Sequence, residues 1–245
     1  DDVISLSIPE LKEPNILPEA LPLDILYEDS DVIVVNKPKG MVVHPAPGHY
    51  TGTLVNALLY HCKDQLSGIN GDLRPGIVHR IDMDTTGSLI VCKNDLAHQS
   101  LSEQLKEHSI HRIYIAIVHG NIKEDEGTVN APIGRHPIDR KKMSTHAKQS
   151  RHAVTHYKVL ERFGNYTYIQ CKLETGRTHQ IRVHMNAIGH PLLGDSLYEN
   201  LSSPDFSFFK RAALHAWKVT FYQPFTGEKI SLEAAFPEDF SYFSR

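Results

Sequence analysis

Runs of apolar residues, continuous or alternating with polar ones, predict a chain built mainly of β-strands. The segment 31–40 (DVIVVNKPKG) is apolar until a proline and a glycine interrupt it, which indicates a buried strand and a turn. The segment 111–119 alternates as a half-buried strand does. Turns at 163–165 and 224–227 join strand-like segments into two hairpins. The predicted strands are 31–40, 76–79, 88–92, 111–119, 154–160, 166–173, 213–222 and 229–235.

Three segments have apolar residues at the spacing of a helix. They are 53–62, which begins with Thr53 as a candidate N-cap, 94–105, and 178–188, which ends at Gly189. Strands therefore outnumber helices and do not alternate strictly with them. This arrangement predicts the α+β class, and no internal repeat is visible.

The first two dozen residues differ in composition from the rest. Residues 1–24 contain four prolines and three glutamates and predict an extended linker. The globular body is expected to occupy residues 25–245. Because linkers join domains, we expect this chain to be the remainder of a longer protein.

Composition places the chain among ordinary globular proteins. It has 245 residues, 40% hydrophobic and 22% charged, and its mean hydropathy is −0.32. No run approaches the roughly 18 apolar residues of a membrane-spanning helix, and no signal peptide is recognisable. Three widely separated cysteines give no disulfide framework, so we expect a reducing cytoplasm.

Positive charge is concentrated in one segment. The net charge of the chain is −3, which does not suggest a generally basic nucleic-acid binder. Segment 135–152, however, holds six lysines and arginines against one acid, Asp139. Two interpretations stand side by side: a surface that binds phosphates, or a solvated loop.

Two polar segments could carry chemistry. The segment 79–87 (HRIDMDTTG) places Asp82 next to Arg80 and Asp84 in a turn between two predicted strands. Alternatively, these side chains only stabilise the turn by bonding to its backbone. The segment 173–184 (LETGRTHQIRVH) opens a helix rich in arginine and histidine, which can bind a carboxylate or phosphate or form an ordinary polar face.

Several other site types are not indicated. The 16 histidines form no HExxH pattern and the cysteines no CxxC pattern, so no metal site is predicted. Phosphate-binding glycine motifs and GxSxG are absent as well. Asp82 and Asp84 could suggest a glycosidase, but their spacing in a turn does not define the distance between the carboxyl groups.

Four segments together resemble the RluA-type pseudouridine synthases. They are 35–59, 76–95, 111–120 and 173–198, and the resemblance covers the chain from about Ile25 to its C-terminus. The large-subunit rRNA branch is the most similar, including 132–144 (PIGRHPIDRKKMS). Members of that branch often carry an N-terminal S4 RNA-binding domain followed by a linker. This chain resembles such a protein with the linker present and the S4 domain missing. Ile81 and Lys39 are mild departures from the family pattern.

The resemblance implies a fold and a set of roles. The fold is a mixed, mainly antiparallel sheet with flanking helices around a central cleft. Asp82 would be the catalytic aspartate and Arg182 the cation that keeps it ionised, with Arg177 as the second candidate for this pairing. Tyr114 would stack on the target base and assist proton loss from C5, and Leu173 would pack against the base. From its place in the sequence alone, Tyr114 could equally be an ordinary buried strand residue.

The resemblance also implies the substrate and its handling. The enzyme would isomerise specific uridines of structured RNA, most simply 23S rRNA, as a monomer and without cofactor or metal. Arg80 would fill the stack vacated by the flipped base, and Arg140, Lys141 and Lys142 would hold phosphates.

Two other functions remain open at this point. A non-catalytic RNA-binding relative would be expected to lack Asp82 or Tyr114, yet both are present. A hydrolase using Asp82 and Asp84 would release free uracil, whereas an isomerase releases none. For the isomerase, three first steps are compatible with the sequence: Asp82 attacks the sugar, attacks the base, or removes a sugar proton.

Overall fold

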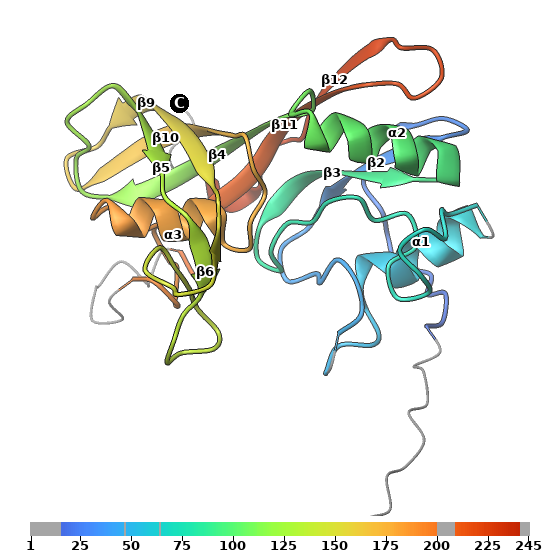
Figure 1. Ribbon diagram of the computed structural model, residues 1–245, viewed down its shortest axis with the longest axis horizontal. Helices are drawn as coiled ribbons and strands as arrows, with labels where there is room; N and C mark the ends of the chain where they lie inside the picture. The colour runs from blue at the N-terminus through green and yellow to red at the C-terminus, as the bar shows by residue number, and fades with distance from the viewer. Residues whose placement is uncertain (1–15, 47, 64, 200–208, 241–245) are drawn as a thin grey trace, which may run out of the picture.

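The computed structural model describes residues 16–46, 48–63, 65–199 and 209–240, which form one curved sheet with helices on both faces (Figure 1). The sheet has the strand order β1-β2-β3-β11-β4-β10-β9-β5, and β12 pairs with β11. Only β3 and β11 pair in parallel, so the predicted mixed, mainly antiparallel sheet of an α+β protein is confirmed. The strands are β1 (Ile25–Glu28), β2 (Val32–Lys37), β3 (Thr86–Cys92), β4 (His111–His119), β5 (Glu126–Asn130), β9 (Val154–Arg162), β10 (Tyr166–Leu173), β11 (Leu214–Tyr222) and β12 (Lys229–Glu233).

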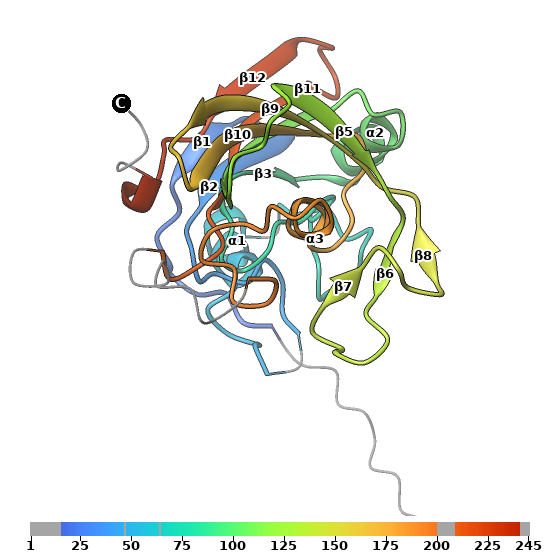
Figure 2. The ribbon, with the colours of Figure 1, turned by 90° about the vertical axis from the view of Figure 1, so that its left-hand side faces the viewer.

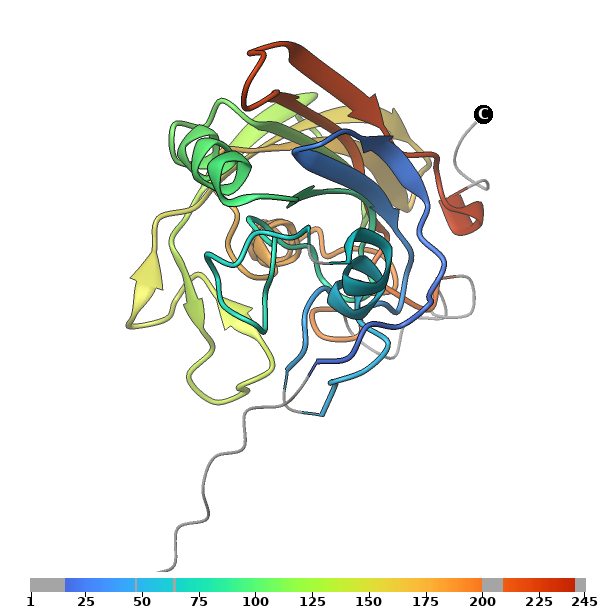
Figure 3. The same cartoon turned by 90° about the vertical axis from the view of Figure 1, so that its right-hand side faces the viewer.

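Helices cover both faces of the sheet because its central strands are apolar on both sides. The helices are α1 (Leu54–Cys62), α2 (Asp95–Lys106) and α3 (Gln180–Ala187). In β2, Ile33 and Val35 share a buried cluster with residues of α1 and α3, whereas Val32 and Val34 pack with α2. The sheet arches over α1 and α3 (Figures 2 and 3). None of the described helices is long and apolar enough to cross a bilayer.

A second, small sheet lies beyond α3 (Figure 2). It consists of β6 (Ile133–Arg135), flanked by β7 (Met143–Ser144) and β8 (Ser150–Arg151). Ile133 anchors its base by packing with Ala153 and Val183 of α3. Residues 135–151, called the basic hairpin below, extend from this base.

The three predicted helices are present, and their boundaries agree within one residue except at the start of the third. Thr53 caps α1 in a reciprocal capping box with Asn56, and Asn94 caps α2 through a 2.9 Å bond to the amide of Ala97. The third helix begins at Gln180 instead of residue 178. Its N-cap, His179, has a φ of 54°, a left-handed conformation that an α-helix does not accept.

The prediction of a strand at 76–79 is wrong. This segment makes only an isolated bridge between Ile77 and Val91. The reason is that the backbone pairing with β3 ends at this bridge: the amide of Cys92 donates to the carbonyl oxygen of Gly76, but the amide of Ile90 donates to the side chain of His79. The short strands β1, β5, β6, β7 and β8 were not predicted, because they contain few apolar residues in alternation.

The predicted linker is described from Ile16 onward, and residues 1–15 lie outside the described part. Residues 16–24 form no helix or strand, yet they lie against α1. Asn56 donates to the carbonyl oxygen of Leu17 at 2.8 Å, and Ile16 and Leu23 pack on the main core. This part of the segment therefore contributes to the surface of the globular body instead of standing apart from it.

Candidate active site

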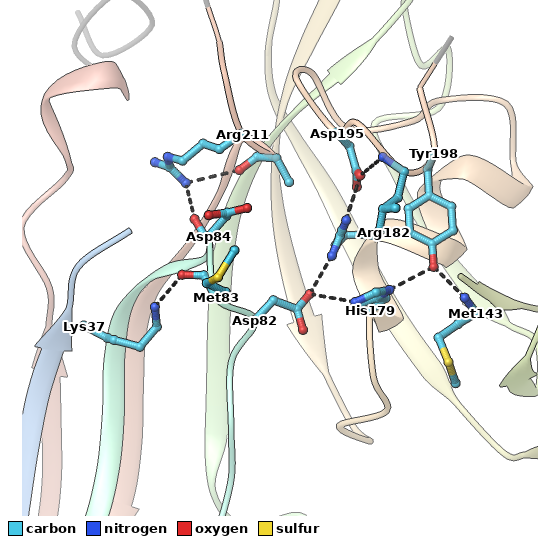
Figure 4. Close-up of polar contacts among 12 residues, drawn as sticks. Lys37, Asp82, Met83, Asp84, Met143, His179, Arg182, Asp195, Tyr198 and Arg211 are labelled. Carbon is cyan, nitrogen blue, oxygen red and sulfur yellow. Dashed lines mark hydrogen bonds and ion pairs between the residues drawn. The ribbon is translucent and has the colours of Figure 1, made fainter. Parts of the chain in front are cut away.

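Asp82 lies on the loop that leads into β3, and two buried cations hold the backbone of this loop (Figure 4). Lys37 donates from Nζ to three carbonyl oxygens, including that of Met83 at 2.8 Å. Arg211 donates from Nη1 to the carbonyl oxygen of Asp84 at 3.0 Å. Burial lowers the pKa of Lys37 to about 7, while the three acceptors favour the ammonium, which has three N–H donors. Hydrogen bonds from these two side chains thus fix the loop just after Asp82.

The carboxylate of Asp82 is paired with Arg182, which projects from α3 (Figure 4). Arg182 Nη1 donates to Asp82 Oδ2 at 3.1 Å. Arg182 also donates from Nε and Nη2 to the two oxygens of Asp195, both at 2.7 Å. Burial alone would lower the pKa of Arg182, but Asp195 and Asp82 together raise it above its usual value. Asp195 therefore fixes the guanidinium, so that an N–H of its third nitrogen, Nη1, points to Asp82.

A second connection reaches Asp82 from the basic hairpin. The amide of Met143 donates to the hydroxyl of Tyr198 at 2.8 Å, and this hydroxyl lies 3.0 Å from Nδ1 of His179 (Figure 4). Since the amide can only donate, the phenolic proton is directed to Nδ1. Burial lowers the pKa of His179, against the charge of Asp82, so the neutral ring carries its proton on Nε2. That nitrogen lies 4.0 Å from Asp82 Oδ2, beyond a direct hydrogen bond.

Asp82 opens onto two adjoining cavities. The larger is a cleft of about 680 Å³ and the smaller a recess of about 70 Å³, and both are lined by Arg80, Asp82 and Arg182. Tyr114 and Leu173 line the recess and are 6% and 8% exposed. Burial raises the pKa of Tyr114, and the charge of Asp82 adds to this effect. The recess therefore combines apolar side chains, among them Tyr114 and Leu173, with charged ones that include Asp82.

The other predicted site residues are partly brought together. Arg80 is exposed and lines both cavities. Arg177 lines the recess, but its Nε donates to the carbonyl oxygen of His152 at 3.0 Å. Of the two candidates for pairing with Asp82, the structure therefore has Arg182 in that place.

The predicted phosphate-binding residues lie apart from Asp82, between β6 and β7. Arg140 and Lys141 are exposed, and Lys142 is half-buried. Arg135 donates to the carbonyl oxygen of Arg140 at 3.0 Å, which braces this turn. The hairpin is connected to the residues around Asp82 through the bond from Met143 to Tyr198.

Sequence reasoning missed several residues of the site. Asp195 and Tyr198 come from the loop after α3, and Lys37 and Arg211 act through backbone carbonyls, so no local spacing marked them. Arg112 lines the recess from β4. The sequence signal that could have identified it is its position two residues before Tyr114, on the same face of a buried strand.

Other chemistries find little support in the described residues. No group of three or more histidine, cysteine or acidic side chains in this part of the chain could hold a metal ion. Cys62, Cys92 and Cys171 are buried free thiols, and burial raises the pKa of each to about 11 or 12. None of them is therefore placed or activated as a nucleophile.

Known proteins share both the sequence and the fold. The family model described as RNA pseudouridylate synthase matches residues 31–187. The uncharacterized RNA pseudouridine synthase YlyB of Bacillus subtilis is 56% identical over 97% of this chain and 77% of its own. Ribosomal large subunit pseudouridine synthase D of Zymomonas mobilis is 47% identical over the same shares. The solved structure of human RNA pseudouridylate synthase domain containing 1 aligns with a TM-score of 0.72 and 27% identity, covering 92% of this chain and 87% of that one.

The matched residues include the loop of Asp82, strand β4 with Tyr114, and α3 with Arg182. Fold, sequence and the arrangement of the cleft therefore agree. The chain belongs to the RNA pseudouridylate synthase family, the isomerases that convert uridine to pseudouridine in RNA.

Proposed function

We propose that Asp82 performs the isomerisation and that large-subunit ribosomal RNA is the substrate. The observation that carries the first part is the placement of one partly exposed carboxylate, 20% accessible, between an anchored arginine and a recess that Tyr114 and Leu173 help to line. In the reaction the bond between uracil N1 and C1′ of the ribose breaks, the uracil turns, and C5 bonds to C1′. The proton on C5 is then lost, and N1 takes up a proton.

Arg182 supports this chemistry by keeping Asp82 ionised. Attack on the sugar, attack on the base and removal of a sugar proton all begin from the carboxylate. A neighbouring cation stabilises that form, and the bidentate contact with Asp195 keeps the cation from moving away. Only Oδ2 of Asp82 is bound by Arg182, which leaves Oδ1 for the substrate.

The lining of the recess supports its use as the site of the flipped base. Tyr114 and Leu173 lie on the neighbouring strands β4 and β10 and line the recess together, so a uracil ring could stack between them next to Asp82. Taking a base out of a folded RNA costs a few kcal/mol. Arg80, exposed at the mouth of both cavities, supplies a planar guanidinium that can replace the lost stacking partner.

The RNA class is inferred from relatives and from charge. The name of the Zymomonas mobilis relative assigns it to the large ribosomal subunit. The basic hairpin, with Arg140, Lys141 and Lys142, provides cations for phosphates at a distance from Asp82. We further propose that the enzyme works as a monomer in the cytoplasm, where its free thiols stay reduced.

Mapping pseudouridines in a strain that lacks the gene tests this function. We expect specific sites in large-subunit rRNA to revert to uridine and to be restored by the wild-type gene, but not by one encoding Asp82→Asn. Loss of pseudouridine from another RNA, with rRNA unchanged, would contradict the proposed substrate. Free uracil released by the purified protein would instead indicate a hydrolase.

A further inference from the structure

Arg112 is a buried cation without a role in the site as described so far. It lies on β4 two residues before Tyr114, so both side chains point to the same face of the sheet. It pairs in register with Leu173 of β10, and the three residues line the same recess. Only 9% of Arg112 is exposed.

The guanidinium of Arg112 is positioned by packing. Its Nε is buried without a hydrogen-bond partner among the described residues. Burial lowers its pKa, and the neighbour that opposes this effect is Tyr114, not a carboxylate. The group lies against Gly176, where an added Cβ would come within 2.7 Å of Nη1.

The other buried cations in the described part of the chain are all bonded. Lys37 has three carbonyl acceptors, Arg182 has the carboxylates of Asp195 and Asp82, and Arg211 has Asp239 at 2.7 Å. Removing a charge from water is unfavourable unless a partner compensates it. Arg112 is therefore the buried cation for which no described residue supplies a hydrogen-bonding partner.

We infer that Arg112 binds a carbonyl oxygen of the flipped uracil and stabilises the negative charge that develops on it. This inference rests on the proposed place of the uracil beside Tyr114. Residues two apart on one face of a strand are separated by about 7 Å, comparable to the width of a pyrimidine with its carbonyl group. A ring stacked on Tyr114 would thus bring its edge to the guanidinium.

The chemistry calls for a cation at this edge. When the bond between N1 and C1′ breaks, its electron pair stays with uracil, and the charge spreads over N1 and the two carbonyl oxygens. The same charge is used when C5 bonds to C1′, and it is absent from both substrate and product. A donor aimed at these oxygens therefore acts on the transition state more than on binding.

Single-turnover rates at saturating enzyme, on an RNA that the wild-type protein modifies, test this assignment. We expect Arg112→Gln to slow isomerisation at least about 100-fold, as loss of one preorganised charge-stabilising donor does. Its RNA affinity should change less than about threefold, because the interaction acts on the transition state. Arg112→Lys keeps the charge without the planar guanidinium. Its rate should lie between those of the wild-type and Arg112→Gln enzymes. Lys106→Gln, a surface change of equal charge on α2, serves as the control.

Sulfur substitution at the target base identifies the atom bound by Arg112. RNAs with 2-thiouridine or 4-thiouridine at the modified position carry a weaker acceptor in place of one carbonyl oxygen. One of them should slow the wild-type enzyme by more than it slows Arg112→Lys. Equal slowing of both enzymes by each analogue would overturn the assignment.

Two further results would also overturn it. A folded Arg112→Gln enzyme with normal rate would show that the cation is dispensable. A loss confined to RNA affinity, with a shallower salt dependence, would assign Arg112 to a phosphate instead. Asp82→Asn measured in parallel separates this outcome from failure of the proposed site, because an active Asp82→Asn enzyme would refute the site itself.

Discussion

The cations around Asp82 and those of the basic hairpin occupy opposite surroundings. Lys37, Arg182 and Arg211 are buried, and each is bound to oxygens of fixed position. Arg140 and Lys141 are exposed in the turn between β6 and β7 of a small sheet whose strands have two or three residues. The two regions meet where the amide of Met143 reaches Tyr198.

This difference indicates two uses of positive charge in one enzyme. Buried cations define the orientation of a loop and of a carboxylate, so their contribution depends on geometry and resists salt. Exposed cations attract phosphates through solvent, and their contributions are nearly additive and fall with ionic strength. Substitutions in the two regions should therefore differ in size and in kind.

Removing Arg182 should have the largest effect on the centre. Arg182→Met leaves buried Asp195 without its bidentate partner and Asp82 without its cation. We expect a loss of about 3–5 kcal/mol in the free energy of unfolding, together with loss of activity. As a control, Lys218→Met breaks the ion pair with the half-exposed Glu233. It should lower the free energy of unfolding by less than about 1 kcal/mol when both variants are measured by denaturant titration. Equal costs would contradict the distinction between buried and exposed charges.

The centre should also be sensitive to acid. Burial lowers the pKa of His79 to about 3, below its value in the unfolded chain. The stability linked to this neutral ring is present above pH 6.5 and is lost as the pH falls toward 3, because the unfolded state binds the proton more strongly. The free energy of unfolding can be measured by chemical denaturation between pH 6 and pH 4. Its slope against pH should be smaller in His79→Gln than in the wild type, by about 1.4 kcal/mol per pH unit. An unchanged slope would show that His79 does not titrate as a buried neutral group.

The link between the regions should have a moderate effect. Tyr198→Phe keeps the ring beneath Arg182 but removes the hydroxyl that joins Met143 to His179. We expect about 1 kcal/mol less stability and a reaction about fivefold slower at saturating RNA. Tyr222→Phe, on the exposed end of β11, is the matched control. A normal rate in Tyr198→Phe would mean that the hairpin does not influence the catalytic centre through this hydroxyl.

The hairpin itself should affect RNA binding and little else. Changing Arg140, Lys141 and Lys142 to Ala should leave thermal stability nearly unchanged and weaken RNA binding. Each phosphate that the variant no longer neutralises should reduce the slope of log affinity against log salt by about 0.7–0.9. The control changes three exposed lysines elsewhere, Lys106, Lys123 and Lys229. If the slope falls equally in both triple variants, the hairpin acts only through net charge.

The sequence predicted the helices and most long strands because their apolar spacing reflects burial on one or both faces. The segment 76–79 was mistaken for a strand because apolar residues do not reveal that its pairing with β3 ends at Ile77, where the amide of Ile90 bonds to the side chain of His79 instead. The strands of the hairpin sheet were missed because two or three residues are too few to show a periodicity.

The site was predictable to a different degree. Asp82, Tyr114 and Arg182 came from resemblance to a family, since spacing alone left a turn or a polar helix face as alternatives. Asp195 and Arg112 were not predicted, because their positions depend on the packing of a loop and of neighbouring strands around the recess. Partners brought together by tertiary structure leave no local pattern.

The most direct test of the central claim compares Asp82→Asn with Asp84→Asn under single-turnover conditions. Asn keeps the size of Asp and an acceptor for Arg182, but it removes the negative charge. We predict that Asp82→Asn folds, binds RNA and forms no measurable pseudouridine, whereas Asp84→Asn remains active. A folded Asp82→Asn enzyme with near-normal turnover would contradict the account, and so would an inactive Asp84→Asn variant accompanied by free uracil in the wild-type reaction.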